Sequence, residues 1–126
     1  IKCFDKSDQV FLTNKLFGCN ILFMSNLAMP KIDRKLITQK LNVVSDLKKI
    51  IKSENVISHE DELRPFETDA LSAYKQKPLV VVFPENTKEV SDILSYCYKK
   101  RIKVVPRGSG TGLSGGALPM ADSILL

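Results

Sequence analysis

Two apolar runs and one stripe with helical spacing dominate the second half of the chain. Leu79–Phe83 is a continuous, valine-rich run between two prolines, which is typical of a strand buried on both faces. A second apolar run, Ile102–Val105, ends at Pro106. Between the two runs, apolar residues recur with helical spacing at Val90, Ile93, Leu94, Cys97 and Tyr98. The pattern predicts a βαβ unit whose two strands are parallel and are joined by a right-handed crossover.

Capping residues indicate where the helices begin. Asn86 is followed three residues later by Glu89, which gives a capping-box pattern at the start of the βαβ helix. Upstream, Asp33 is placed to cap a short helix whose apolar positions are Ile32, Leu36, Ile37 and Leu41. Ser45 is predicted to open a second helix, over residues 45–53, with apolar residues on one face and lysines on the other.

Two further segments complete the expected organisation. Residues 58–69, SHEDELRPFETD, are acidic and interrupted by Pro65, so we expect an exposed, irregular connection. Ser123–Leu126 has the pattern of the opening of a buried strand. We expect Ile124–Leu126 to be a stub at an open sheet edge, which would favour aggregation.

The chain is expected to divide into three segments. We interpret residues 1–23 as a disordered extension outside the fold, residues 24–78 as a helical amino-terminal segment with the acidic connection, and residues 79–126 as the start of an incomplete domain. The apolar stretch Leu16–Met24 has nine residues, which is too short to span a bilayer. A signal peptide is the alternative interpretation, but no clean A-x-A site follows this stretch.

Composition and charge narrow the possible functions. The net charge of +5 comes from scattered lysines and from the run Lys99–Arg101, without interleaved aromatic residues, so nucleic-acid binding is not expected. The three cysteines are widely spaced, form no C-x-x-C pair, and suit a reducing compartment. Cys97 is expected to be a small core residue.

We expect no metal site and no catalytic residue. His59 lies in the acidic segment, where we expect it to be solvated. Glu60, Asp61 and Glu62 are consecutive and lack the turn glycine and the ligand spacing of a calcium loop.

Five of the six glycines lie in one stretch, residues 107–116, RGSGTGLSGG. Glycine lets another molecule approach the backbone closely, and successive N–H groups can converge on an anion. Ser109, Thr111 and Ser114 add hydroxyl donors, and Arg107 adds a charged fork suited to phosphate. Because the stretch directly follows the second strand, it lies where open α/β sheets bind ligands. The sequence therefore predicts a phosphate or pyrophosphate site.

Two well-known phosphate motifs fit the stretch incompletely. Gly110 and Gly115 have the glycine spacing of a P-loop, but Gly116 and Ala117 stand where lysine and serine or threonine should be. The dinucleotide pattern G-x-G-x-x-G is matched formally, but Gly116 and Pro119 break the helix that should follow. A flexible surface loop is the remaining alternative, although such linkers rarely follow a buried strand.

Pro106–Pro119, PRGSGTGLSGGALP, resembles the pyrophosphate-binding loop of FAD-linked oxidases of the vanillyl-alcohol-oxidase, or PCMH, type. The likeness continues upstream through ENVISHEDELRPFETDALSAYKQKPLVVVFPENTKEVSDIL and covers about residues 33–126. Within the family, the chain is similar to the branch that contains the flavin subunits of bacterial glycolate oxidases and D-lactate dehydrogenases. Residues 1–23 have no counterpart there.

The resemblance implies an α+β fold built from α/β subdomains. Residues 79–126 would be the first βαβ part of a PCMH-type FAD-binding domain, truncated. The residues that would cradle the FAD pyrophosphate are Pro106, Arg107, Gly108, Ser109, Gly110, Thr111, Gly112, Leu113, Ser114, Gly115 and Gly116. Thr111 stands where some relatives carry a histidine bonded to the flavin, which implies noncovalent FAD.

The resemblance also implies a function. The chain would be the amino-terminal fragment of an FAD-dependent oxidoreductase acting on 2-hydroxy acids such as glycolate or D-lactate. Its implied partners are other oxidase subunits, and its implied location is the cytoplasm, peripheral to the inner membrane as part of an oxidase complex. The alternative is a noncatalytic remnant, or a split-subunit piece that needs a partner chain. We expect these 126 residues alone neither to bind FAD tightly nor to oxidise a 2-hydroxy acid.

Overall fold

The computed structural model describes residues 31–126, which form one compact unit. The extension predicted for residues 1–23 and the apolar stretch Leu16–Met24 lie outside the described residues. The helices are α1 (Arg34–Thr38), α2 (Lys40–Ile50) and α3 (Thr87–Lys100), with short 3₁₀ turns at Ser53–Asn55 and Arg64–Phe66. No helix among the described residues is long and apolar enough to cross a membrane.

Four short strands form one sheet. They are β1 (Val56–Ile57), β2 (Val80–Val82), β3 (Lys103–Val105) and β4 (Ser123–Leu125), in the spatial order β1-β2-β4-β3. β4 pairs in parallel with both β2 and β3, and β1 pairs antiparallel with β2. The predicted parallel βαβ unit is therefore confirmed, with β4 inserted between its two strands.

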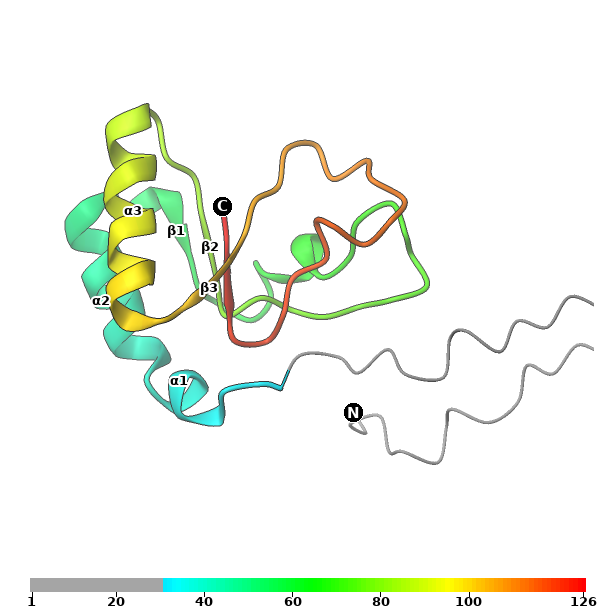
Figure 1. The fold of residues 1–126 in the computed structure, drawn as a ribbon, viewed down its shortest axis with the longest axis horizontal. Coiled ribbons are helices and arrows are strands. Elements are labelled where there is room, and N and C mark those ends of the chain that lie inside the picture. The colour runs from blue at the N-terminus through cyan, green and yellow to red at the C-terminus, as the bar shows by residue number, and fades with distance from the viewer. Residues whose placement is uncertain (1–30) are drawn as a thin grey trace, which may run out of the picture. The chain divides into compact units, whose positions relative to one another are not determined.

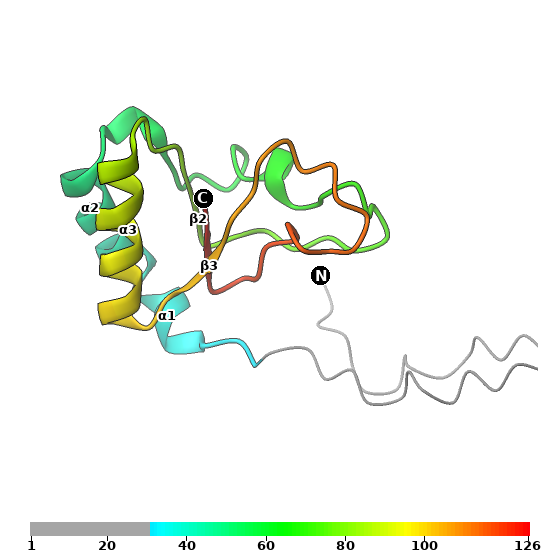
Figure 2. The same cartoon turned by 45° about the horizontal axis from the view of Figure 1, so that its top comes forward.

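The sheet separates two layers. Helices α2 and α3 cover one face, whereas the irregular segments that follow β1 and β3 lie on the other side, as two views show (Figures 1 and 2). Alternate strand residues face the two layers. Val80, Val82 and Ile124 pack with α2 and α3, while Val81 and Leu125 pack with Leu63. Both faces of the sheet are thus covered, which explains the continuous apolar runs.

The strand at the end of the chain is central, which corrects the expectation of a stub at an open edge. Ile124 pairs with Val80 on one side and with Val104 on the other. Its side chain is fully buried. The physical reason is burial, because Ile124 packs with the α2 and α3 side of the core and Leu125 packs with Leu63. Both faces of β4 are thus covered, and a position between β2 and β3 also pairs both of its edges. The edge strands of this sheet are β1 and β3.

The predicted helix caps are partly confirmed. The Asp33 carboxylate accepts a hydrogen bond from Lys35 N at the start of α1. The Asn86 side chain accepts from Glu89 N at 3.0 Å, and the Glu89 carboxylate accepts from Glu85 N at 2.8 Å. The predicted start at Ser45 is wrong, because α2 begins at Lys40. The buried residues Val43 and Val44 precede Ser45, so burying them places the helix start upstream of it.

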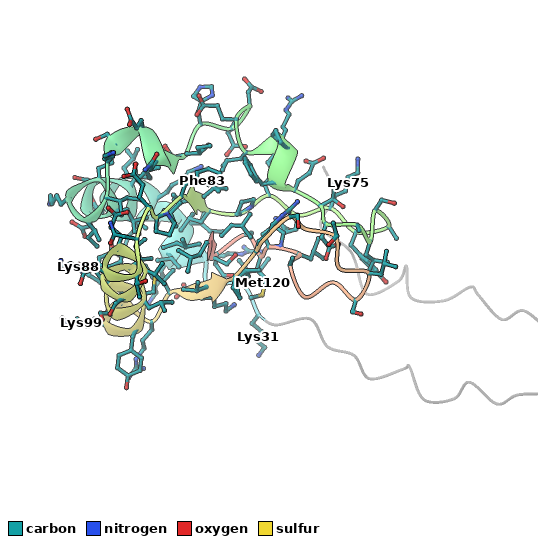
Figure 3. The ribbon with its side chains drawn as sticks, turned by 90° about the horizontal axis from the view of Figure 1, so that it is seen from above. Lys31, Lys75, Phe83, Lys88, Lys99 and Met120 are labelled. Carbon is teal, nitrogen blue, oxygen red and sulfur yellow. The ribbon has the colours of Figure 1, made fainter. Side chains whose placement is uncertain are left out.

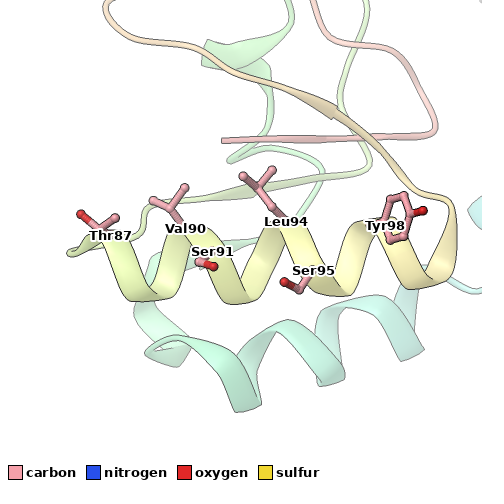
Figure 4. A pocket seen from close by; sticks show the side chains of 6 residues that line it. All are labelled: Thr87, Val90, Ser91, Leu94, Ser95 and Tyr98. Atoms are coloured by element: carbon pink, nitrogen blue, oxygen red, sulfur yellow. The ribbon is translucent and has the colours of Figure 1, made fainter.

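The apolar stripe of α3 is buried only along its centre. Ile93 and Cys97 are buried, and Cys97 is the small core residue that was expected. In contrast, Leu94 is 44% exposed and Tyr98 is 87% exposed. Together with Val90 they lie along a shallow, open groove on α3 (Figure 4). Helical spacing thus predicted the helix correctly but predicted too wide a buried face.

The acidic segment, residues 58–69, is irregular as predicted but is not merely an exposed connection. Its charged residues Glu60, Asp61 and Glu62 are exposed, as is His59. Leu63, by contrast, is fully buried against Val81 and Leu125, and Asp69 is 6% exposed. The segment forms the second covering layer of the sheet, because the apolar face opposite the helices also requires burial.

Residues on both sides of position 78 contribute to the same sheet. β1 precedes this position and pairs with β2, which follows it. The division into residues 24–78 and residues 79–126 stays a prediction about domain organisation. Within the described residues, the sheet crosses that boundary.

A buried carboxylate ties the start of the described chain to the sheet. Asp122 is 1% exposed, and its Oδ2 accepts hydrogen bonds from Asp33 N at 2.7 Å and from Lys103 Nζ at 2.8 Å. Lys103 Nζ also donates to the Lys31 carbonyl at 2.8 Å. Burial opposes ionisation of Asp122, but these hydrogen bonds and the Lys103 charge keep its pKa below the usual 3.8.

The lowered pKa of Asp122 predicts an acid-dependent loss of stability. Because the folded-state pKa is depressed, the stabilisation is fully present above the unfolded-state pKa and is lost as the pH falls through the folded-state value. The free energy of unfolding is measured by urea denaturation at a series of pH values. We expect Asp122→Asn to make its decrease at acid pH less steep. Glu85→Gln, which removes an exposed carboxylate that also has a lowered pKa, should alter that decrease less. Equal effects of the two variants would contradict the assignment.

Candidate functional site

The glycine-rich loop begins at the edge of the sheet where the carboxyl ends of β2, β4 and β3 meet. The loop connects β3 to β4 and lies on the side of the sheet opposite α2 and α3 (orange in Figure 1). Its first residue is anchored, because Arg107 N donates to the Leu126 carbonyl at 2.7 Å and Leu126 N donates to the Val105 carbonyl at 3.0 Å. The predicted position beyond the end of a parallel strand is confirmed.

The loop holds a run of backbone donors that the chain does not use. Within the described residues 31–126, no N–H group from Gly108 to Gly116 donates a hydrogen bond to a backbone carbonyl. Most of these residues are exposed, including Gly108, Gly112 and Gly116. A run of unpaired N–H groups at the carboxyl edge of a parallel sheet is a donor set suited to a polyanion.

Two of the glycines are required by backbone conformation. Gly110 has φ +70° and Gly115 has φ +73°, in the left-handed region that side chains other than glycine rarely adopt. A Cβ at Gly110 would also lie 2.6 Å from the Arg107 guanidinium nitrogens Nε and Nη2. These two positions therefore shape the loop itself.

At the other three loop glycines, neither the backbone conformation nor a neighbouring protein atom of the described chain requires glycine. Gly108, Gly112 and Gly116 have φ outside the left-handed region, and a Cβ at any of them would meet no protein atom within 4 Å. Side chains at these positions would instead occupy the space in front of the loop. Glycine there leaves the backbone open to close approach by another molecule, as the pyrophosphate predicted from the sequence would require.

Residues 66–71 lie against the loop and are named here the 66–71 segment. Ala70 N donates to the Gly110 carbonyl at 2.9 Å. Arg107 Nη1 donates to the Thr68 carbonyl at 2.7 Å and to the Phe66 carbonyl at 3.4 Å. These contacts could not be predicted from the sequence, because their partners are backbone groups, which leave no signal in the side-chain pattern. A direct phosphate contact of Arg107 stays a prediction.

A buried carboxylate lies in the 66–71 segment. Asp69 Oδ1 accepts from Leu71 N at 2.9 Å, while its Oδ2 is buried with no hydrogen-bond partner in the described chain. Leu71 Cδ2 would lie 3.7 Å from a Cβ at Gly115, so the segment also lines the far end of the loop.

The charged and metal-binding types of side chain outside the loop do not gather into a second site within the described residues. Among residues 31–126, no group of three or more histidine, cysteine or acidic side chains could hold a metal ion. Glu60 pairs with Lys77 at 3.0 Å, and the hydrogen bond from Lys77 keeps the pKa of Glu60 below its usual value. Figure 3 shows the labelled Lys88 and Lys99 on α3 and Lys75 at the opposite end of the molecule, so these charges form no single patch.

Comparison with known proteins shows which domain and which enzymes the chain is similar to. Residues 78–126 match the FAD binding domain family. A glycolate oxidase subunit of Escherichia coli is 40% identical over 99 residues, which are 79% of this chain and 19% of that protein. A mitochondrial D-2-hydroxyglutarate dehydrogenase of Arabidopsis thaliana is 40% identical over 83 residues, which are 66% of this chain and 15% of that protein.

A solved structure supports the fold. An alkyldihydroxyacetonephosphate synthase matches with a TM-score of 0.56 at 18% identity, covering 96% of this chain and 24% of that one. At this identity the likeness shows the fold alone. The matched residues span only 15–19% of the length of the two curated relatives named above.

The expected resemblance to FAD-linked oxidases of the PCMH type is confirmed. Residues 78–126 match an FAD-binding domain, and this match supports FAD as the cofactor. The free N–H groups and the three glycines without an internal packing role fit the pyrophosphate of that cofactor. Among its relatives the chain is similar to a glycolate oxidase subunit and to dehydrogenases named for D-2-hydroxyglutarate and D-lactate.

Proposed function

We propose that this chain supplies the pyrophosphate-binding loop of an FAD-dependent oxidoreductase that acts on 2-hydroxy acids. The observation that carries the proposal is the run of unused N–H groups from Gly108 to Gly116 at the carboxyl edge of the parallel sheet. Glycolate and D-lactate are the proposed substrates, because relatives named for glycolate and D-lactate are 40% and 42% identical over the matched segments.

The proposed work of the loop is binding and orientation. The N–H groups would donate to the phosphate oxygens, and the hydroxyls of Ser109, Thr111 and Ser114 would add neutral donors. Charged acceptors such as phosphate oxygens strengthen such hydrogen bonds. FAD, when bound, supplies the chemistry by accepting a hydride equivalent from the α-carbon of the 2-hydroxy acid. The described residues would hold the pyrophosphate end of the cofactor in place for that step.

We also propose partners and a location for the whole protein. The similarity to a glycolate oxidase subunit supports assembly with other oxidase subunits. The proposed location is the one that the family resemblance implies: the cytoplasm, peripheral to the inner membrane as part of such a complex.

A competition experiment tests whether the loop recognises the diphosphate. Binding of FAD to a completed full-length chain is followed by flavin fluorescence while ADP, AMP or riboflavin is added at increasing concentration. We expect ADP to displace FAD most effectively, because it carries the adenosine diphosphate portion of the cofactor, and riboflavin to displace it least. Displacement by riboflavin but not by ADP would contradict a pyrophosphate site in this chain.

The attachment of the flavin is predicted to be noncovalent. The single histidine of the sequence, His59, lies in the exposed acidic segment, and Thr111 offers a hydroxyl in the loop. After acid precipitation of a completed full-length chain loaded with FAD, we expect the flavin fluorescence in the supernatant. Fluorescence that stays with the denatured polypeptide on a gel would contradict this prediction.

A further inference from the structure

We propose that Arg107 is a positioning residue that locks the glycine-rich loop onto the 66–71 segment before FAD binds, and that it is not a phosphate ligand. The inference rests on the proposed function of the loop. It concerns how the loop keeps the shape that presents its N–H groups. Three observations carry it.

The first observation is the placement of the Arg107 guanidinium. Nη1 donates to two backbone carbonyls of the 66–71 segment, those of Thr68 and Phe66. The group also lies close to Gly110, where a Cβ would be 2.6 Å from Nε and Nη2. The guanidinium is thus held between the 66–71 segment and the loop, and Gly110 leaves it the room to lie there.

The second observation is a hydrogen bond in the reverse direction. Ala70 N donates to the Gly110 carbonyl at 2.9 Å. The loop therefore donates to the segment through Arg107 and accepts from it through Gly110. Residues 66–71 and 107–110 are far apart in sequence, so these contacts fix the loop by tertiary structure and do not depend on local turn preference.

The third observation concerns the direction of the loop donors. The described chain has no cis peptide bond, and in a planar trans peptide the carbonyl and the following N–H point in opposite directions. Because the Gly110 carbonyl is directed at Ala70, the N–H of Thr111 is directed away from the 66–71 segment. The contact thus turns one of the unused donors outward, where a ligand can reach it.

A loop fixed in this way binds more tightly than a free one, because less conformational entropy is lost when the ligand is bound. Removing the guanidinium should release the Gly110 turn even when no cofactor is present. A direct phosphate ligand would behave differently: its removal would leave the free loop unchanged and would weaken binding through loss of one charge.

The test uses the whole chain and the variants Arg107→Ala and Arg107→Lys, with Arg64→Ala as a control that removes one exposed positive charge. The first measurement is amide hydrogen exchange of Ala70 without cofactor. We expect exchange of this amide to accelerate at least about tenfold in both Arg107 variants and to stay unchanged in Arg64→Ala. Unchanged exchange of the core amides of Ile93 and Cys97 would show that the variants remain folded.

The second measurement is binding of FAD and of ADP by a completed full-length chain at several salt concentrations. We expect about a tenfold weaker affinity in both Arg107 variants, with the same salt dependence as the unaltered chain. Unchanged Ala70 exchange, together with a reduced salt dependence in Arg107→Ala and affinity retained in Arg107→Lys, would overturn the proposal and assign Arg107 to the phosphate. If the unaltered chain bound neither FAD nor ADP, the proposed function would fail, and Ala70 exchange alone would decide the positioning role.

Discussion

In a completed full-length chain, replacing Gly112 with valine should abolish FAD binding while leaving the fold intact. Gly112 lies in the middle of the run of unused N–H groups, and its φ does not require glycine. A Cβ at this position meets no protein atom, so the branched side chain should be tolerated by the free chain. The same side chain would occupy the space through which a phosphate approaches the backbone. We expect at least about a hundredfold loss of affinity, as for several lost charge-assisted hydrogen bonds.

The controls separate ligand approach from loop conformation. Leu113→Val places a branched side chain at an already exposed residue of the same loop and should change the affinity little. Gly110→Ala should also impair binding, but through the loop itself, because φ is +70° and the Arg107 guanidinium fills the space. The free energy of unfolding of Gly112→Val should stay within about 0.5 kcal/mol of the unaltered chain. FAD binding that survives in Gly112→Val would refute the assignment of the loop.

Replacing Ile124 with alanine should cost more stability than any other change considered above. Ile124 is fully buried on the central strand β4 and packs with the α2 and α3 side of the core. Truncation of such a residue typically costs about 2–5 kcal/mol, because apolar contacts are lost and a cavity remains. That cost is a large part of the roughly 5–15 kcal/mol that stabilises a typical domain. Chemical denaturation followed by circular dichroism measures it.

An exposed aliphatic residue provides the matched control. Leu41→Ala removes an aliphatic side chain of the same size from α2, where Leu41 is 82% exposed. We expect it to change the unfolding free energy by no more than about 0.5 kcal/mol. Equal costs of the two substitutions would contradict the central position of β4. They would also support the open-edge stub that the sequence pattern alone predicts.

The helices and strands that could be predicted are those determined by the pattern of residues close together in the sequence. The run Leu79–Phe83, the capping residue Asn86 and the helical spacing to Cys97 each report on neighbouring residues, and each indicated the correct element. The position of β4 depends on pairing with two strands that are remote in sequence. No local pattern specifies that pairing, so the strand was predicted but its place in the sheet was not.

The candidate site divides in the same way. Glycines and hydroxyl residues in one stretch predicted an anion-binding loop, because their chemistry is visible in the sequence itself. The contacts of Arg107 with the 66–71 segment could not be predicted, since their acceptors are backbone carbonyls that every residue carries. Likewise, which glycines are required by φ and which leave open space became clear only from the backbone geometry.

The most direct test of the proposed function observes the loop donors themselves. Two-dimensional ¹H–¹⁵N NMR spectra of the chain are recorded while FAD is added to millimolar concentration, a range that also detects weak binding. The account predicts saturable shifts of the amide signals of residues 108–116, the same shifts on addition of ADP, and no shifts for the amides of α2. Loop signals that stay in place while amides elsewhere shift would contradict the claim that this loop binds the pyrophosphate of FAD.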